Sequence, residues 1–270
     1  MLVLSLTAAC TATVRAQNQS LSGPADRAAE ASITETPIKD YKVENVTMTE
    51  ALLKLRDCDL RQVLIGFEAV PHREGEKGRS ISLKVDAGTL GEVVRHLCEA
   101  DPRYEYAVVQ GPIGHTDLKG SMMEIRPKGA LKDRTDLLNM RVRDYEIDSN
   151  ITAGEAILHI NQDAPELQEF LHRKAEGWRQ RKGIPPGPEI GAIMHGNMIP
   201  PRFTLRLHDV TVRQILDVIS LKSIDVYEQQ PEVNAQGMRG KPYPTGWRYD
   251  FVIKPAASTG IGGIPEWQYF

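Results

Sequence analysis

The chain has 270 residues, of which 41% are hydrophobic and 26% charged. This is the composition of an ordinary globular protein, and it excludes a fibrous or largely disordered chain. The formal net charge of −3 gives no general attraction to nucleic acid or to an anionic membrane. The length fits one large domain or two small ones.

The N-terminus is predicted to be a secretory signal peptide, residues 1–16. Met1 to Val14 is uncharged, and Val14-Arg15-Ala16 has the small-residue pattern of a cleavage site, although no Lys or Arg precedes the apolar run. Leu6-Thr7-Ala8-Ala9-Cys10 resembles a weak lipobox, so a lipid anchor at Cys10 is an alternative, and an N-terminus without a targeting role is another. The sequence favours cleavage and export to the periplasm or the extracellular space over an outer-membrane lipoprotein.

After this segment, residues 17–37 are predicted to be flexible, and an internal repeat organises the rest of the chain. Residues 45–55 and 150–160 share Asn, Thr, Glu, Ala and Leu at corresponding positions, and three further positions exchange one aliphatic residue for another. Residues 81–97 match 203–219, and Glu124–Pro127 matches Val252–Pro255. Three matches in the same order indicate a duplication.

Each repeat contains two helix starts with the capping-box pattern, in which a Thr is followed three residues later by Glu or Gln. The pairs are Thr47/Glu50, Thr89/Glu92, Thr152/Glu155 and Thr211/Gln214. Behind each box the apolar residues recur at i, i+3, i+4 and i+7, which predicts one buried stripe per helix. Alternating or β-branched segments predict the strands, at 41–43, 64–67, 81–85, 104–108 and 123–125, then at 145–147, 203–207, 224–227 and 247–253.

The predicted fold class is therefore α+β, with two tandem β-α-β-β-α-β-β modules, each with two helices packed on small sheets. Module 1 is predicted at 38–128, a linker at 129–136 and module 2 at 137–256. The module resembles the short N-terminal (STN) domain of secretins and TonB-dependent transducers. The resemblance is carried by the Thr-x-x-Glu-Ala-Leu helix start, the Ile-Ser-Leu-Lys-Val type of strand, a second Thr-led helix and a closing aromatic hairpin. It implies a domain without catalytic residues that docks other envelope proteins, but it does not identify the partner.

The second module departs from the repeat at an insertion, residues 162–201. A new helix is predicted from Asp163-Ala164-Pro165-Glu166, with Pro165 in its first turn, and a run of Pro and Gly follows it. The sequence favours a solvated helix whose Trp178 covers the edge of the sheet. A docking arm is the second interpretation, because Trp and Arg are common interface anchors, and a basic helix that binds lipid or nucleic acid is the third. The candidate partner-binding residues are Phe170, Arg173, Lys174, Trp178, Arg179 and Arg181, together with Trp247.

No motif for catalysis is found in the sequence. The seven His residues show no metal-ligand spacing, and no phosphate loop, nucleophile elbow or dinucleotide fingerprint is present, so neither a metal nor a cofactor is predicted. The leading hypothesis is an exported, non-catalytic scaffold or adaptor of a bacterial cell envelope. Its partner would be an envelope protein and not nucleic acid, and no transmembrane span is expected after the signal peptide.

Two further hypotheses stay open. One is a periplasmic binding protein for a small molecule or cell-wall fragment, with a cleft between the modules near Trp178, Trp247 and Tyr249. The other is an enzyme, which a compact cleft with clustered His, Asp or Glu would favour. Cys58 and Cys98 permit one disulfide in an oxidising compartment, but both also extend apolar helix stripes. The last residues, 257–270, are predicted to be a Gly-containing tail that is mobile or docks as a small peptide.

Overall fold

The computed structural model describes residues 33–56, 58, 63–73, 75–111, 118, 120–158, 160–182, 203–228, 246–253 and 264–269. The predicted signal peptide, the lipidation of Cys10 and the Pro- and Gly-rich part of the insertion lie outside these residues. Ile33 is buried in the core, so the segment predicted to be flexible is ordered from this residue onward. Helices combine with small sheets, in agreement with the predicted α+β class.

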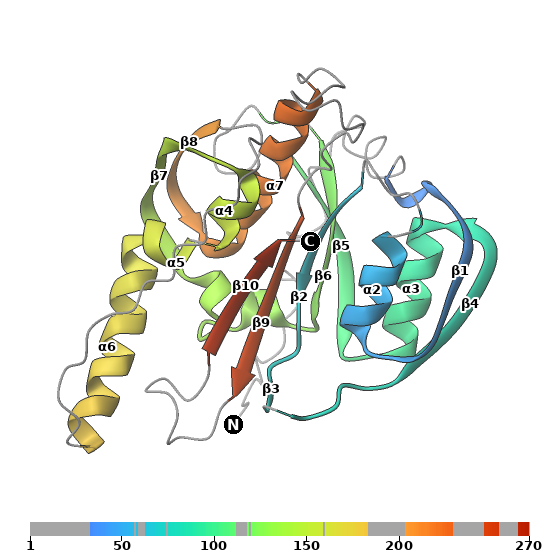
Figure 1. Cartoon of the computed structure of the whole chain (residues 1–270), viewed down its shortest axis with the longest axis horizontal. Helices are drawn as coiled ribbons and strands as arrows, with labels where there is room; N and C mark the ends of the chain where they lie inside the picture. Colours follow the sequence, from blue (N-terminus) through green and yellow to red (C-terminus); the bar gives the residue numbers. More distant parts are fainter. Residues whose placement is uncertain are drawn as a thin grey trace, which may run out of the picture.

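The first half of the chain places two helices between two sheets. Its elements are β1 (Pro37–Val46), α2 (Met48–Arg56), β2 (Leu64–Glu68), β3 (His72–Arg73), β4 (Ile81–Thr89), α3 (Leu90–Ala100), β5 (Tyr104–Gln110) and β6 (Ser121–Pro127). β1 pairs with β4 in a two-stranded antiparallel sheet, and α2 and α3 lie between this pair and β5 (Figure 1). The apolar stripes of both helices are buried, as the spacing predicts.

The second half begins with two 3-10 turns, η1 (Ala130–Lys132) and η2 (Leu137–Asn139). Its other elements are β7 (Arg141–Ile151), α4 (Ala153–Leu158), α5 (Ile160–Asp163), α6 (Pro165–Lys182), β8 (Phe203–Thr211), α7 (Val212–Glu228), β9 (Trp247–Ile253) and β10 (Ile264–Tyr269). β7 and β8 form another two-stranded antiparallel sheet. Figure 1 shows this pair on the opposite side of the molecule from β1 and β4.

All four predicted capping boxes form, and they explain where the four helices begin. In each box the Thr hydroxyl oxygen accepts from the backbone N–H three residues later, at 3.1–3.3 Å. The Glu or Gln side chain in turn accepts from the Thr backbone N–H, at 2.7–2.9 Å. Each cap stabilises its helix by about 1 kcal/mol.

Each of the two outer strand pairs has one irregularity in its register. In β1–β4 the register shifts between Val43, opposite Leu83, and Val46, opposite Ile81. In β7–β8 it shifts between Ile147, opposite Leu205, and Ile151, opposite Phe203. In both pairs extra residues of the first strand lie opposite one residue of the second, and such bulges bend a strand and increase its local twist.

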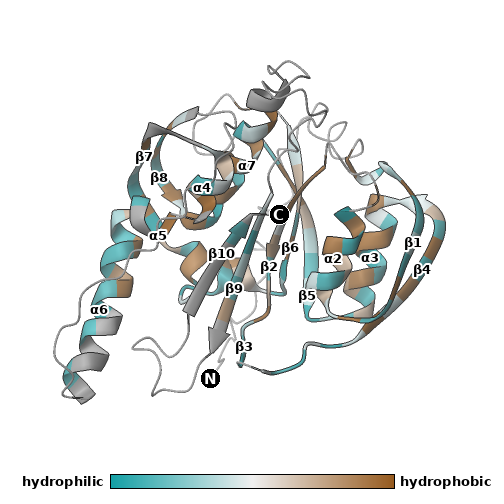
Figure 2. Cartoon of the chain, viewed as in Figure 1, coloured by the Kyte–Doolittle hydropathy of each residue, from teal (hydrophilic) through white to brown (hydrophobic). Residues whose placement is uncertain are grey.

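A six-stranded sheet in the order β10-β9-β2-β6-β5, with β3 beside β9, separates two hydrophobic cores. Ile65, Phe67 and Met123 face the core of α2 and α3, whereas Leu64 and Met122 face the core of α4 and α7. The layers are therefore strand pair, helices, central sheet, helices and strand pair (Figure 1). Figure 2 shows apolar residues on the helices that border the sheet and a mainly hydrophilic α6.

Two predictions about the second half are wrong. Residues 224–227 were expected to form a strand because they alternate, but α7 continues through them to Glu228. Packing of α7 along its length, where Leu221 and Ser223 are buried, overrides the local pattern. The prediction of a mobile tail is also wrong for Ile264–Tyr269, since this segment forms β10 and pairs with β9 over its whole length.

The insertion begins as predicted, with α6 starting at Pro165. Ala164 and Leu167 are buried, and Phe170 and Leu171 pack half-buried against the core. Beyond them the helix extends away from the rest of the protein (Figure 1). α6 therefore packs against the core through its first turns and projects beyond them.

Cys58 and Cys98 are half-buried and are not joined to each other, so the disulfide that the sequence permits is not formed. The Cys58 thiol lies 3.6 Å from the carbonyl oxygen of Lys54. Burial raises the pKa of the Cys98 thiol to about 11, which keeps it protonated at neutral pH. Both residues behave as small core side chains, the second of the two predicted roles.

The junction between β2 and β9 can be tested at Gly66, which contacts the indole of Trp247. A Cβ at this position would lie 2.7 Å from Cε2 of that buried ring. We expect Gly66→Ala to lower the free energy of unfolding by about 1–3 kcal/mol in urea denaturation, because the rigid ring has no room to move. Gly78→Ala is the control, since its Cβ would meet only the Thr47 side chain, with the methyl carbon at 3.2 Å. Equal stability of Gly66→Ala and the wild type would contradict this packing.

Candidate functional site

A buried ionic network joins the two halves of the chain at Arg213. This residue lies in the first turn of α7, and its guanidinium contacts carboxyl groups from β2, β6 and the turn before η2. Nη2 donates to Glu68 at 2.5 Å and to Asp136 at 3.4 Å, and Nη1 donates to Glu124. The Arg213 side chain is only 5% exposed, so these contacts are shielded from water.

A second guanidinium extends the network along β6. Arg126 donates to Glu124 at 2.5 Å and to Glu105 of β5 at 3.1 Å. Glu124 thus lies between two arginines. Charges this deeply buried are tolerated only when they are paired and hydrogen-bonded.

The network holds more carboxyl groups than guanidinium groups, so its negative charge would exceed its positive charge if every carboxyl group were ionised. Bound protons reduce this excess. Burial raises the pKa of Glu68 to about 8 despite the nearby Arg213. Burial also raises the pKa of Asp136, which shares a hydrogen bond with Glu68. Because the two carboxyl groups are coupled, the raised pKa of both favours one proton held by the Glu68–Asp136 pair near neutral pH.

Asp217 is a further buried carboxyl group, one turn after Arg213 on α7. Burial raises its pKa to about 8, and the neighbouring Glu124 adds to the shift. The indole Nε1 of Trp247 donates to it at 2.8 Å. This bond anchors the start of β9 to α7.

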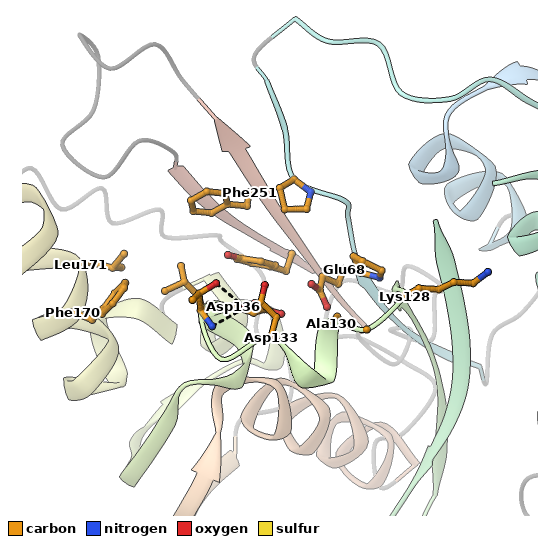
Figure 3. Close-up of a pocket in the computed structure, with 14 residues that line it drawn as sticks. Glu68, Lys128, Ala130, Asp133, Asp136, Phe170, Leu171 and Phe251 are labelled. Carbon is orange, nitrogen blue, oxygen red and sulfur yellow. Dashed lines mark hydrogen bonds between the residues drawn. The ribbon is translucent and has the colours of Figure 1, made fainter. Parts of the chain in front are cut away.

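A cavity of about 400 Å³ opens beside Glu68 and Asp136. Aromatic and aliphatic side chains from α6 and β9 form its walls, among them Phe170, Leu171 and Phe251 (Figure 3). Asp133 lies near Glu68 and Asp136, and the Lys128 side chain points away from these carboxyl groups (Figure 3). The remaining lining residues are Pro71, Pro127, Gly129, Ala130, Thr135, Leu137 and Tyr249.

Asp133 supplies a charged carboxylate at this cavity. Its side chain accepts from the Thr135 hydroxyl at 2.7 Å and from the Thr135 backbone N–H at 2.8 Å. These bonds hold the pKa of Asp133 below its usual range. The cavity therefore combines apolar walls with one ionised carboxylate and one pair of carboxyl groups that share a proton.

The predicted partner-binding residues fall into three groups. Phe170 lines the cavity, and Arg173 is exposed on α6, 3.7 Å from Glu169. Lys174, Trp178, Arg179 and Arg181 also lie on α6, but their side chains are outside the described part of the structure. Trp247 is fully buried, so its assignment to a partner-binding surface is wrong.

Of the residues near which a cleft was predicted, Tyr249 lines the cavity and Trp247 is buried against Asp217, while the Trp178 side chain is outside the described part of the structure. Sequence reasoning missed Glu68, Glu124, Asp136 and Arg213 because they are far apart along the chain. One feature of the sequence does point to two of these residues as buried polar groups. Glu68 and Glu124 interrupt apolar strands that face a core, and such positions are buried polar candidates.

Among the described residues, no cluster of three or more His, Cys, Asp or Glu side chains could hold a metal ion. None of the described helices is long and apolar enough to cross a membrane. Comparisons of the chain with models of protein families, with curated proteins and with solved structures find no match.

The proton on Glu68 can be tested by the pH dependence of stability. Because the pKa is higher in the folded state than the value near 4.3 of an unfolded Glu, the folded protein binds a proton that the unfolded chain has lost. The contribution of this group is therefore lost as the pH rises from about 4 to about 8. Glu68→Gln mimics the protonated acid and lacks this dependence. We expect the free energy of unfolding of the wild type, relative to that of Glu68→Gln, to fall by up to about 1.4 kcal/mol per pH unit between pH 5 and 8.

The control is Glu169→Gln, which removes one negative charge from an exposed position on α6. The measurement is urea denaturation of the three proteins at each pH. A constant difference between the wild type and Glu68→Gln over this range would contradict the assignment of the proton.

Proposed function

We propose that the chain is an exported, non-catalytic scaffold or adaptor of a bacterial cell envelope, built from two tandem STN-like modules. The four capping boxes and the two outer strand pairs, each with a bulge in its first strand, support the duplication. The strands that match in sequence, β6 and β9, both lie beside β2 and run parallel to it, which also supports it. The arrangement of two helices between small sheets is the one that the resemblance implies.

The observation that carries the docking function is the outer edge of β5. Within the described residues, no strand pairs with this edge, and β5 ends the six-stranded sheet. Its sequence, Tyr-Glu-Tyr-Ala-Val-Val-Gln, has one charge, and that residue, Glu105, is paired with Arg126. Edge strands are normally protected by Pro or by several charges, and an unprotected edge favours addition of a strand from a partner.

The other edges are better protected. Each of them carries a Pro or several charged residues. These are Pro37, Lys39 and Lys42 in β1, Lys84 and Asp86 in β4, Arg141, Arg143 and Asp144 in β7, Arg206 and Asp209 in β8, and Pro265 and Glu266 in β10. The contrast selects β5 as the docking edge. The partner we propose is an envelope protein that presents an extended segment.

The backbone of β5 shows which amides a partner would use. Lys128 N–H donates to the carbonyl of Arg103, and Gly111 N–H donates to that of Gly120, so the odd-numbered residues of β5 bond to β6. Since alternate amides of a strand point to opposite sides, those of Tyr106 and Val108 point outward.

The docking edge can be blocked at Val108. We expect Val108→Pro to weaken binding of an envelope partner by about tenfold or more, because it removes an outward N–H and obstructs the edge. The measurement is recovery of the partner from envelope extracts by the tagged chain. Val108→Thr is the control, since it keeps the N–H and the shape of the side chain.

Hydrogen exchange gives a second readout on the unmodified protein. The amides of Tyr106 and Val108 should become protected when the partner binds, whereas those of Ala107 and Val109 already bond to β6. Recovery of no partner, or recovery that Val108→Pro leaves unchanged, would contradict docking at β5. Loss of binding on deletion of the projecting part of α6 alone would instead assign docking to the insertion.

The cavity favours a second candidate function, the binding of a small molecule. It lies between elements of both halves of the chain and is lined mainly by apolar and aromatic side chains with a few polar groups. Ligand sites are typically of this kind and of this size. A thermal-shift screen with envelope glycans, metallophores and a fragment library tests this function independently of docking.

A further inference from the structure

We infer that the cavity beside Glu68 and Asp136 binds an organic cation, a ligand with an ammonium group on an apolar body. This inference rests on the second candidate function, the binding of a small molecule, and not on docking at β5. Three observations support it: the apolar walls of the cavity, the acidic side chains that line it, and the direction of the Lys128 side chain.

The walls fit an apolar body. Phe170 and Leu171 of α6 lie on one side of the cavity and Phe251 of β9 on another (Figure 3). Tyr249 adds a further aromatic ring. Aromatic faces attract cations as well as apolar groups, and rings around a cation are a common recognition site for substituted ammonium groups.

The polar groups at the cavity fit a positive charge and not a negative one. Glu68, Asp133 and Asp136 all line it. Arg213 is already bonded to Glu68 and Asp136 and is not one of the residues that line the cavity. The Lys128 side chain points away from the carboxyl groups (Figure 3). An anion would therefore face the Asp133 carboxylate and the Glu68–Asp136 pair, whereas an ammonium group would be attracted by the negative charge that these groups carry.

Binding of a cation would be coupled to release of a proton. An ammonium group near the pair favours the ionised form of Glu68, so the proton shared with Asp136 leaves for solvent when the ligand binds. The charged or titratable groups around Glu68 are Arg213 on α7, Glu124 on β6, Asp136 before η2 and Tyr249 on β9. All of them are fixed by the fold, so the ligand is the only cation added.

The test uses three probes of one shape and different charge: benzylamine, benzyl alcohol and benzoate. We expect benzylamine to bind the full-length protein at pH 7 about tenfold or more tighter than benzyl alcohol, and benzoate to bind still more weakly, by isothermal titration calorimetry. With the permanent cation benzyltrimethylammonium, affinity should rise from pH 6 to pH 8. The heat of binding should also depend on the ionisation enthalpy of the buffer, as proton release requires.

Two variants locate the site without large changes in shape. Glu68→Gln cannot release the proton, so it should lose both the buffer dependence and about tenfold in affinity. Asp136→Asn removes a charge while its amide oxygen can still accept from Leu138 N–H, the bond that begins η2. Asp144→Asn on β7 is the control, since its exposed carboxyl lies beside His208 and not in the cavity.

The outcomes separate the two ideas. Equal binding of benzyl alcohol and benzylamine, or tighter binding of benzoate, would overturn the inference about charge and leave small-molecule binding in place. Binding of benzylamine that Glu68→Gln and Asp136→Asn leave unchanged would overturn the location. If no probe binds, the inference is overturned, and the fragment screen decides whether the cavity binds any small molecule.

Discussion

The contact of Arg213 with three carboxyl groups is the interaction on which the rest of the structure depends. Glu68, Glu124 and Asp136 come from the first half of the chain and the turn that follows it, whereas Arg213 begins the last helix of the second half. Removing Arg213 would leave three largely buried acidic side chains without this cation, at a cost of roughly several kcal/mol. The position of α7 against the central sheet is therefore set by charge as well as by apolar packing.

The same sheet makes one body of the two halves. Under the proposed duplication, β9 corresponds to β6, and β6 has β2 as its parallel neighbour. At the place along the chain where the first half has β2, the described part of the second half has the helices α5 and α6. β9 pairs with the β2 of the first half. One strand thus serves as a neighbour to both repeats. Its Gly66 is required because the Trp247 ring fills the space that a Cβ would occupy.

Much of the fold could be predicted because it is encoded locally. Helix starts depend on a Thr and a Glu or Gln within four residues, and the buried stripes depend on spacing within each helix, so both were recovered. Residues 224–227 and β10 could not be assigned in this way. Residues 224–227 alternate like a strand but extend a packed helix, and β10 exists because β9 offers it an edge.

The candidate site was the least predictable part, for a related reason. Glu68 and Arg213 are separated by 145 residues, and their neighbours give no sign that they meet. Trp247 was expected to be an interface anchor because Trp is common at interfaces, yet its indole serves as a buried donor to Asp217. In both cases the role of the side chain is set by the partner that the topology brings to it.

A buried ionic network is a weak means of stabilising a protein, since apolar residues of the same volume often serve as well or better. The network in this chain also contains two carboxyl groups whose pKa is raised to about 8, Glu68 and Asp217, and each lowers stability when it ionises. Stability alone therefore does not account for placing Glu68 at the wall of a cavity. Under the proposed cation binding, a ligand next to the aromatic walls would displace the proton held by Glu68 and Asp136. Occupancy of the cavity would then be linked to the contacts of Arg213 that join the two halves.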